Sequence, residues 1–222
     1  MPSTDRPTPR RRRPPERARA ELLAAAEALA VERGPDAVTL AAVARAVGVT
    51  AGLVTHYFGT RDALLREVLG KQDALTRRRV RAALRAGTEA PDADVLLRVL
   101  FEALSEPTRV RLFVWAHLRG DFERGSSGGL RALVDELEAR FRSTLPPRRV
   151  PPRSRIESVV LLALAAIHGW AVGKRSWLEG LGLGAPAPER DREFLAALTA
   201  VLRDLMSRPV RGQSGEGYLR RT

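Results

Sequence analysis

Two short helical segments separated by a glycine constrain this chain more than any other feature of the sequence. Apolar residues recur at helical spacing from Leu40 to Val47, Gly48 ends that segment, and a second segment runs from Thr50 to Phe58. Helices of about eight residues are unstable alone, so the two must pack on each other and on a preceding helix. Ala44 is small enough for a close crossing, and Gly48 tolerates the positive φ of a tight turn. The pattern predicts a helix-turn-helix, in which the second helix enters the DNA major groove.

The second segment has distinct inward and outward sides when it is projected at about 100° per residue. Val54 and Phe58 fall on the inward side. The residues expected to read base edges lie opposite and are Gly52, Thr55 and His56, of which Gly52 clears space and the other two form hydrogen bonds. Those expected to contact DNA phosphates are Thr39, Thr50, Tyr57 and Arg61. Because few side chains on this face can form hydrogen bonds, we expect sequence preference to depend partly on DNA shape.

The rest of the chain also reads as helices separated by proline or glycine. A long helix is expected to begin near Thr60, and later ones cover about 92–105, 107–119, 127–145, 153–180 and 189–207. No strand alternation or internal repeat is evident. The predicted fold is all-α, with a three-helix helix-turn-helix domain followed by a larger helical bundle. The expected divisions are a disordered basic arm at 1–15, the DNA-binding domain at 16–65, a regulatory and dimerisation domain at 66–207, and a flexible tail at 208–222.

The charge of the chain favours a phosphate-rich partner, since the formal net charge is +12. A codon bias toward arginine is the alternative explanation, because only Lys71 and Lys174 of the 38 basic residues are lysine. The arginines expected to enter a minor groove lie in the N-terminal arm and are Arg10, Arg11, Arg12 and Arg13, with a solvated tail as the alternative. There is no cysteine, which excludes disulfides, thiolate metal sites and a cysteine nucleophile.

The sequence does not predict a membrane protein. The basic N-terminus lacks the apolar region of a signal peptide. The most apolar run, Val159–Gly173, has about 15 residues, whereas a spanning helix needs roughly 20. We therefore expect a cytoplasmic protein in which this run is a buried core helix.

The run "TLAAVARAVGVTAGLVTHYFGTRDALLREVL" resembles the N-terminal DNA-binding domain of the TetR family of bacterial repressors. The resemblance covers about 45 residues, from Glu21 to Leu65, and the positions that match the family pattern unchanged are Gly48, Val49, Gly52, Tyr57, Phe58, Asp62 and Leu64. Among the departures, Thr55 replaces the usual tyrosine, Ala51 stands where a polar or basic residue is frequent, and Arg61 replaces a phosphate-contacting lysine. The resemblance implies a homodimer that binds a palindromic operator in double-stranded DNA and is released by a small-molecule inducer.

The second half resembles the family's ligand-binding and dimerisation domain in the number and length of its helices. Two runs, "LFVWAHLRGDF" and "GWAVGKRSWLEGLGL", are similar to the branch that includes the choline-responsive repressor. The resemblance implies a pocket, for which the candidates are Phe101, Phe113, Trp115, His117, His168 and Trp170, and a dimer interface, for which they are Val160, Leu164, Ile167, Phe194, Leu198, Val201 and Leu205. Ordinary packing in the monomer core is the alternative for both sets. His117 and His168 lack partners at metal-ligand spacing, so we expect neither a metal nor a cofactor.

Two other function classes remain as alternatives. A sequence-indifferent architectural DNA-binding protein is compatible with the sparse base-reading face and the net charge of +12. An all-α enzyme is less favoured, because the sequence offers no nucleophile–base pair, metal-ligand set or phosphate-binding loop.

Overall fold

The computed structural model describes residues 14–86, 91–118 and 127–208, and the secondary structure of these residues is entirely helical. The chain divides into two compact units, one that ends at Leu69 and one that starts at Gly70. The predicted all-α fold is confirmed. The predicted boundary after residue 65 and the observed division both fall within one long helix, α4 (Arg61–Ala86).

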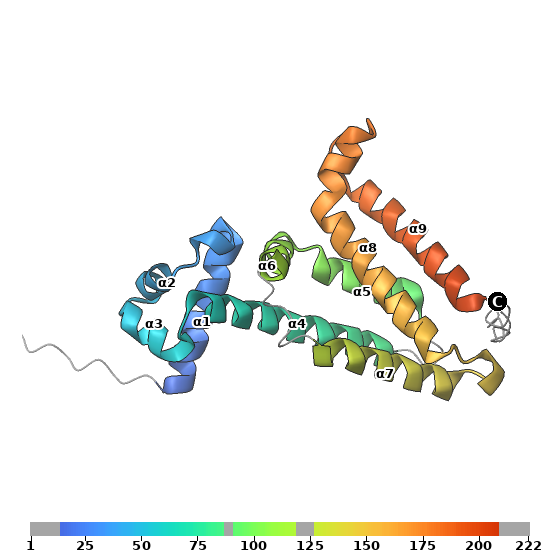
Figure 1. The fold of residues 1–222 in the computed structure, drawn as a ribbon, viewed down its shortest axis with the longest axis horizontal. Coiled ribbons are helices and arrows are strands. Elements are labelled where there is room, and N and C mark those ends of the chain that lie inside the picture. The colour runs from blue at the N-terminus through green and yellow to red at the C-terminus, as the bar shows by residue number, and fades with distance from the viewer. Residues whose placement is uncertain (1–13, 87–90, 119–126, 209–222) are drawn as a thin grey trace, which may run out of the picture. The chain divides into compact units, whose positions relative to one another are not determined.

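The first unit contains α1 (Pro15–Arg33), a 3-10 turn η1 (Pro35–Ala37), α2 (Leu40–Val47), α3 (Ala51–Phe58) and the start of α4, as Figure 1 shows. α2 packs against both α1 and α3. The side chains that fill the centre of this unit are Leu22, Ala26, Ala30, Val38, Val43, Ala44, Val54, Phe58, Leu64, Leu65 and Val68. Each short helix is therefore stabilised by burial against the others, as the length of the helices requires.

The second unit contains the remainder of α4 with α5 (Ala93–Leu104), α6 (Pro107–Leu118), α7 (Ser127–Thr144), α8 (Arg153–Gly180) and α9 (Pro188–Ser207). α8 is the organising helix, because it packs against α5, α6, α7 and α9. Figure 1 shows α8 and α9 side by side. The helix bounds agree with those predicted from proline and glycine positions to within about two residues.

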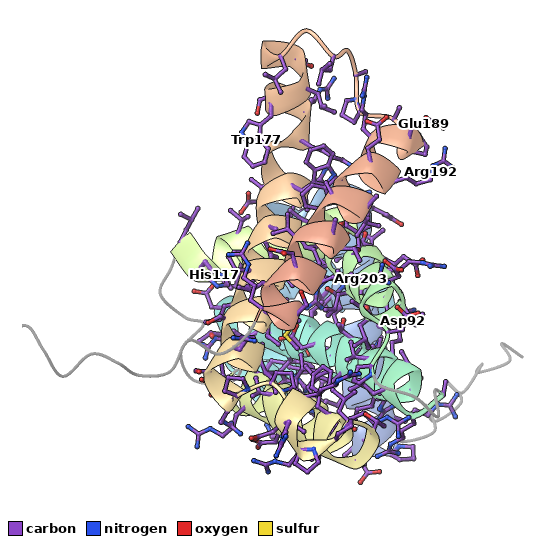
Figure 2. The ribbon with its side chains drawn as sticks, turned by 90° about the vertical axis from the view of Figure 1, so that its right-hand side faces the viewer. Asp92, His117, Trp177, Glu189, Arg192 and Arg203 are labelled. Carbon is purple, nitrogen blue, oxygen red and sulfur yellow. The ribbon has the colours of Figure 1, made fainter. Side chains whose placement is uncertain are left out.

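Exposed ion pairs lie along α9 in the second unit. Arg203 of α9 points toward Asp92 at the start of α5 (Figure 2), with 3.7 Å between Nη2 and Oδ1, and Nη2 also lies 2.5 Å from Oδ2 of Asp94. On the outer side of α9, Arg192 pairs with Glu189 at 2.6 Å. These side chains are all substantially exposed, so each pair contributes little to stability.

α8 leaves much of its apolar surface uncovered within one chain. By length and composition alone it is the one described helix that could cross a membrane, yet only 28% of its most apolar window is buried. Exposed apolar side chains on α8 include Leu161, Leu162, Val172 and Trp177. Trp177 lies on the side of the helix pair away from Glu189 and Arg192 (Figure 2). The sequence-based expectation of a buried core helix is therefore right for one face of α8 and wrong for the other.

Candidate nucleic-acid interface

The turn between α2 and α3 sets the direction in which α3 leaves the first unit's core. Gly48 adopts φ 72° and ψ 39°, the left-handed conformation predicted for it. Its amide donates to Arg45 O, and the amide of Val49 donates to Ala44 O at 2.9 Å. The two helices are bent by 114° at this turn, which lies within the range of a helix-turn-helix. α3 is thus a separate helix with one covered side and one free side.

The covered side of α3 is anchored by Val54 and Phe58, as the helical projection predicts. Val54 is fully buried, and the Phe58 ring is covered by the Arg19 guanidinium, whose Cζ lies 5.1 Å from the ring centroid. Arg19 in turn donates to both carboxylate oxygens of Glu67 at 2.6 Å. This link between α1, α3 and α4 was not predicted. Arg19 and Glu67 are 48 residues apart, so no local spacing in the sequence indicates it.

The free side of α3 carries the three predicted base-reading residues, Gly52, Thr55 and His56, and all three are exposed. A Cβ added to Gly52 would find its nearest neighbour, Oγ1 of Thr50, at 4.0 Å. Nothing inside the protein therefore requires a glycine at position 52, and the free space lies on the outer surface of the helix.

The hydroxyl of Thr55 has a defined direction. Oγ1 lies 3.1 Å from the carbonyl oxygen of Ala51, which can only accept, so the hydroxyl donates its proton inside the helix. What Thr55 offers outward is therefore a methyl group and an acceptor oxygen. On this face His56 is the side chain with a nitrogen available to donate to a base.

Thr39 and Thr50, two of the predicted phosphate contacts, cap the short helices. Oγ1 of Thr39 accepts from the amide of Ala42 at 3.0 Å, and Oγ1 of Thr50 accepts from the amide of Leu53 at 3.4 Å. A hydroxyl that accepts from a cap amide keeps its own proton to donate elsewhere. Both threonines are exposed, so each retains a donor suitable for a phosphate oxygen.

Tyr57 is half-buried on the flank of α3. Its ring meets the His56 ring edge-on at 5.5 Å between centroids and lies 6.5 Å from the Phe58 ring. The ring therefore links the outward His56 to the buried Phe58. Its predicted phosphate contact stays a prediction.

Arg61 has a different place from the one expected. Its Nε donates to Val38 O at 2.7 Å and its Nη2 donates to Pro35 O at 2.8 Å, while Nη1 lies 3.6 Å from Oδ1 of Asp62. All three guanidinium nitrogens thus face groups of the first unit. The side chain ties the start of α4 to the loop before α2, and the phosphate contact predicted for Arg61 stays a prediction. The predicted arginine arm, Arg10 to Arg13, lies outside the described residues.

Of the six predicted pocket residues, two line a cavity in the second unit. Phe113 and His168 border a cavity of about 150 Å³, with their rings stacked at 3.8 Å and 14°. Arg109 and Asp73 also line it, and neither was predicted. Their chemistry is polar, whereas the prediction relied on aromatic and histidine side chains.

The other four predicted pocket residues do not line that cavity. Phe101 is buried against Phe194 at 6.1 Å between centroids, in the core shared by α5, α8 and α9. Trp170 stacks on Phe194 at 4.5 Å and donates its indole N–H to Asp191 at 2.7 Å. Trp115 is half-buried and His117 is exposed, and neither lines the 150 Å³ cavity. Aromatic side chains in this unit serve mainly as packing.

A second cavity of about 380 Å³ lies between α4, α5, α7, α8 and α9. Its lining is largely aliphatic, with Arg149, Arg203 and Asp92 among the polar residues. Val80, Leu100 and Leu133 line both cavities and so form a shared wall. The two cavities are adjacent spaces in one helical bundle.

The seven residues predicted for the dimer interface differ in their exposure within one chain. Ile167 is fully buried and Val160 is nearly so, each within a core cluster of the second unit, so neither is available to a second chain. Leu164, Phe194 and Leu198 pack against the same clusters and are half-buried, as is Leu205, and Val201 is 61% exposed. The uncovered face of α8 is formed by other residues, among them Leu161 and Val172.

Comparison with known proteins places the first unit in a family. Residues 22–68 match the profile described as "Bacterial regulatory proteins, tetR family", and this stretch contains α2, α3 and the turn between them. A sequence comparison with curated proteins finds no match.

Solved structures share the fold of most of the chain. A TetR-family transcriptional regulator from Pectobacterium atrosepticum is 23% identical, with a TM-score of 0.66, and the alignment covers 88% of this chain and 97% of that one. The multidrug binding protein EbrR in complex with imidazole is 19% identical, with a TM-score of 0.62 and coverage of 86% and 96%. RolR in complex with resorcinol is 20% identical, with a TM-score of 0.51 and coverage of 89% and 96%. These similarities extend through the second unit and establish its fold.

Proposed function

We propose that this chain, whose residues 22–68 match the profile of the TetR family of bacterial regulatory proteins, is a cytoplasmic, dimeric repressor released from DNA by a small molecule. Each chain inserts α3 into a major groove, and the two-fold symmetry of the dimer requires a palindromic operator. The observation that carries the proposal is the two-sidedness of α3. Val54 and Phe58 hold one side in the core while Gly52, Thr55 and His56 stand exposed on the other.

The hydrogen-bonding groups on that face limit which bases it can distinguish. Thr55 offers an acceptor outward, which suits the amino groups of adenine or cytosine in the major groove. His56 can donate to guanine or adenine N7. Gly52 allows the helix backbone to approach the base edges closely. With so few base contacts, the remaining preference comes from DNA shape and from phosphate contacts by Thr39, Thr50 and Tyr57.

The exposed apolar face of α8 and α9 supports a homodimer. Leu161 is 60% exposed, Val172 is 58% exposed and Val201 is 61% exposed in a single chain. Apolar side chains repeated along one helix at this exposure mark an interaction surface in a water-soluble protein. Packing α8 and α9 against their copies in a second chain would bury these residues in a four-helix interface.

The response to a small molecule is assigned to the second unit. α4 carries residues of both units, because it starts at Arg61, which is bonded to the loop before α2, and continues to Asp73 and Val80, which line a cavity. Two conformations of the protein would differ in the placement of α4, and a molecule bound in a cavity beside α4 would have a different affinity for each. Such a molecule would shift the equilibrium between the form that binds DNA and the form released from it.

Selection of DNA sites from a random pool with the purified full-length protein tests the function. The expected product is a palindrome, and His56→Ala should weaken binding to it far more than binding to random duplex. Val31→Ala, an exposed change on α1 outside the interface, is the control and should leave both affinities unchanged. Recovery of no consensus, or equal loss on both duplexes, would instead indicate an architectural protein that binds DNA without sequence preference.

A further inference from the structure

The larger cavity of the second unit, of about 380 Å³, has an apolar interior and a polar rim. Side chains from α4, α5, α7, α8 and α9 surround it, and Phe141 is the one aromatic residue among those that line it. The polar residues of the lining are Asp92, Arg149, Arg203 and Ser207, and all four are exposed. The rest of the lining is apolar.

The polar residues lie at one end of the helical bundle. Asp92 precedes α5, Arg149 ends the 3-10 turn η3 (Pro147–Arg149) before α8, and Arg203 and Ser207 lie toward the end of α9. Figure 2 shows Asp92 and Arg203 facing each other. These ends of the helices form the mouth of the cavity, because their lining side chains reach solvent.

From this mouth the cavity extends into the bundle along two helices. Its lining runs from Ala93 to Leu100 on α5 and from Ile156 to Ala163 on α8. Seven residues of helix span about 10 Å, so the cavity is about that deep. Ala163 is only 3% exposed, so the inner end is closed.

The interior selects an apolar occupant. Beyond the mouth, the described residues that line the cavity offer no polar side chain, so a polar group on the inner part of a ligand would lose its hydrogen bonds to water without replacement. Protein interiors hold few voids larger than a water molecule. A hydrocarbon chain would fill this one and remove apolar surface from water.

The cavity volume limits the length of that chain. An apolar protein cavity of about 150 Å³ holds one benzene molecule, which has six carbon atoms. By the same ratio, 380 Å³ has room for about fifteen carbon atoms. The depth and the volume together suit a chain that enters from the mouth, more readily than a small compact molecule that would leave most of the space empty.

The charges at the mouth favour a negatively charged end group. Nη2 of Arg203 is already paired with Asp94 at 2.5 Å, and the hydroxyl of Ser207 donates to Asp204 O at 2.9 Å. Arg149 forms no ion pair with any residue that the structure describes. Because Arg149 is exposed, its attraction for an anion is weak, so it selects the end group while the apolar interior supplies most of the affinity.

We propose that the larger cavity binds an unbranched aliphatic acid of about twelve to fifteen carbons, with its chain in the interior and its carboxylate at the mouth beside Arg149. Val80 of α4 lines this cavity, so an occupant contacts the helix that continues into the first unit. As an inducer site the cavity rests on the proposed function. As a binding site it rests on the cavity alone.

Calorimetric titration of the full-length protein with saturated fatty acids, from six to eighteen carbons and below their micelle concentrations, tests the chain. One acid should bind per chain of protein. Affinity should rise by up to about fourfold for each added CH₂ group while the chain is still being buried. It should then level off near fifteen carbons, where the cavity is full. Affinity that does not change with chain length, or that keeps rising up to eighteen carbons, would overturn the proposal.

A comparison of decanoate, decan-1-ol and decylamine at pH 7.5 tests the end group. Decanoate should bind about two- to fivefold more tightly than the alcohol, and decylamine more weakly than both. Arg149→Gln should remove the advantage of decanoate and leave the dependence on chain length intact. Arg148→Gln, at an exposed arginine of the same turn that does not line the cavity, is the matched control and should keep the advantage. An amine that binds as tightly as the acid, or an equal loss in both variants, would refute the assigned end group.

Ala163→Leu locates the chain, because it adds three carbon atoms at the closed end of the cavity. The levelling-off should move to shorter acids by about three carbons. Ala139→Leu, at an exposed alanine of α7 outside the lining, is the control and should leave the series unchanged. A folded Ala163→Leu protein with an unchanged series would place the acids elsewhere and refute the site. The series on the wild-type protein tests the proposal even where this variant does not fold.

Release of the selected operator is measured separately with the acid that binds most tightly. Acid binding that leaves operator affinity unchanged supports the site and contradicts its role as inducer. Failure of every acid to bind, alongside intact binding to a palindrome, overturns the site and leaves the DNA-binding function standing. Acid binding by a protein that selects no palindrome supports the site and contradicts the proposed function.

Discussion

Replacing Gly52 with alanine should separate stability from DNA binding. The added Cβ meets nothing inside the protein closer than 4.0 Å, so it creates no internal clash. Removing a glycine from a helix stabilises the fold by roughly 0.5–1 kcal/mol, which for a chain of this size is a rise in Tm of about 1–4 °C. On DNA the same methyl group lies on the face that approaches the bases. Displacing one base contact costs about 1–3 kcal/mol, or roughly 5- to 150-fold in operator affinity.

Thermal unfolding and fluorescence anisotropy on the selected operator measure the two effects of Gly52→Ala. Gly70→Ala is the matched control, because Gly70 is also a helical glycine with open space around its α-carbon but lies in α4, outside the α2–α3 interface. The control should gain similar stability and keep its operator affinity. Unchanged operator affinity in Gly52→Ala would refute the close approach of α3 to the bases. A loss of stability would refute the inferred open space.

Three further predictions address the roles assigned to other residues. Arg61→Ala should lower the free energy of unfolding by about 1–3 kcal/mol in urea titrations, because it leaves buried carbonyls unpaired. Arg66→Ala, at an exposed position, should lower it much less. An equal loss of stability in the two variants would contradict the structural role of Arg61. Leu161→Glu should dissociate the dimer, as measured by light scattering, whereas Leu118→Glu, at an exposed leucine of α6, should not. A Leu161→Glu protein that remains dimeric would show that this face of α8 is not the dimer interface. Since burial lowers the pKa of His168, the unfolded chain takes up its proton first, so stability should fall as pH drops below the unfolded value of about 6.5. His168→Phe should remove that part of the pH dependence, and an unaltered profile in urea titrations would contradict it.

Helix positions could be predicted from the sequence because glycine and proline mark them locally. Gly48 was expected to end α2 in a positive-φ conformation and does so, and the projection of α3 correctly places Val54 and Phe58 inward. The structural contacts of Arg61 could not be predicted, because its partners are the carbonyls of Pro35 and Val38, more than twenty residues earlier. Main-chain carbonyls exist at every position, so no pattern in the sequence identifies those that an arginine will meet.

The faces of α8 illustrate a second limit of prediction from the sequence. Apolar residues occur almost all around this helix, so helical spacing defines several stripes but not the one that faces the chain's own core. The stripe containing Val160 and Ile167 packs inward against α5, α7 and α9, which leaves Leu161 and Val172 outside. Only the packing of the whole bundle decides between these stripes.

The cavity shows the same dependence on tertiary structure. Arg109 and Asp73 are 36 residues apart on different helices, and each alone resembles an ordinary surface charge in the sequence. Their burial beside His168 appears only once α4, α6 and α8 are packed. Aromatic residues were predicted to line the pocket, but Phe101 and Trp170 pack in the core of the bundle.

In the proposed function, two chains bind one palindrome through their α3 helices. The affinity of the wild-type protein should be measured for the selected operator and for a duplex of equal length in which one half-site is scrambled, at a single salt concentration. We expect two chains per intact operator and loss of most of the affinity when one half-site is scrambled. One chain per operator, or equal affinity for the two duplexes, would contradict it.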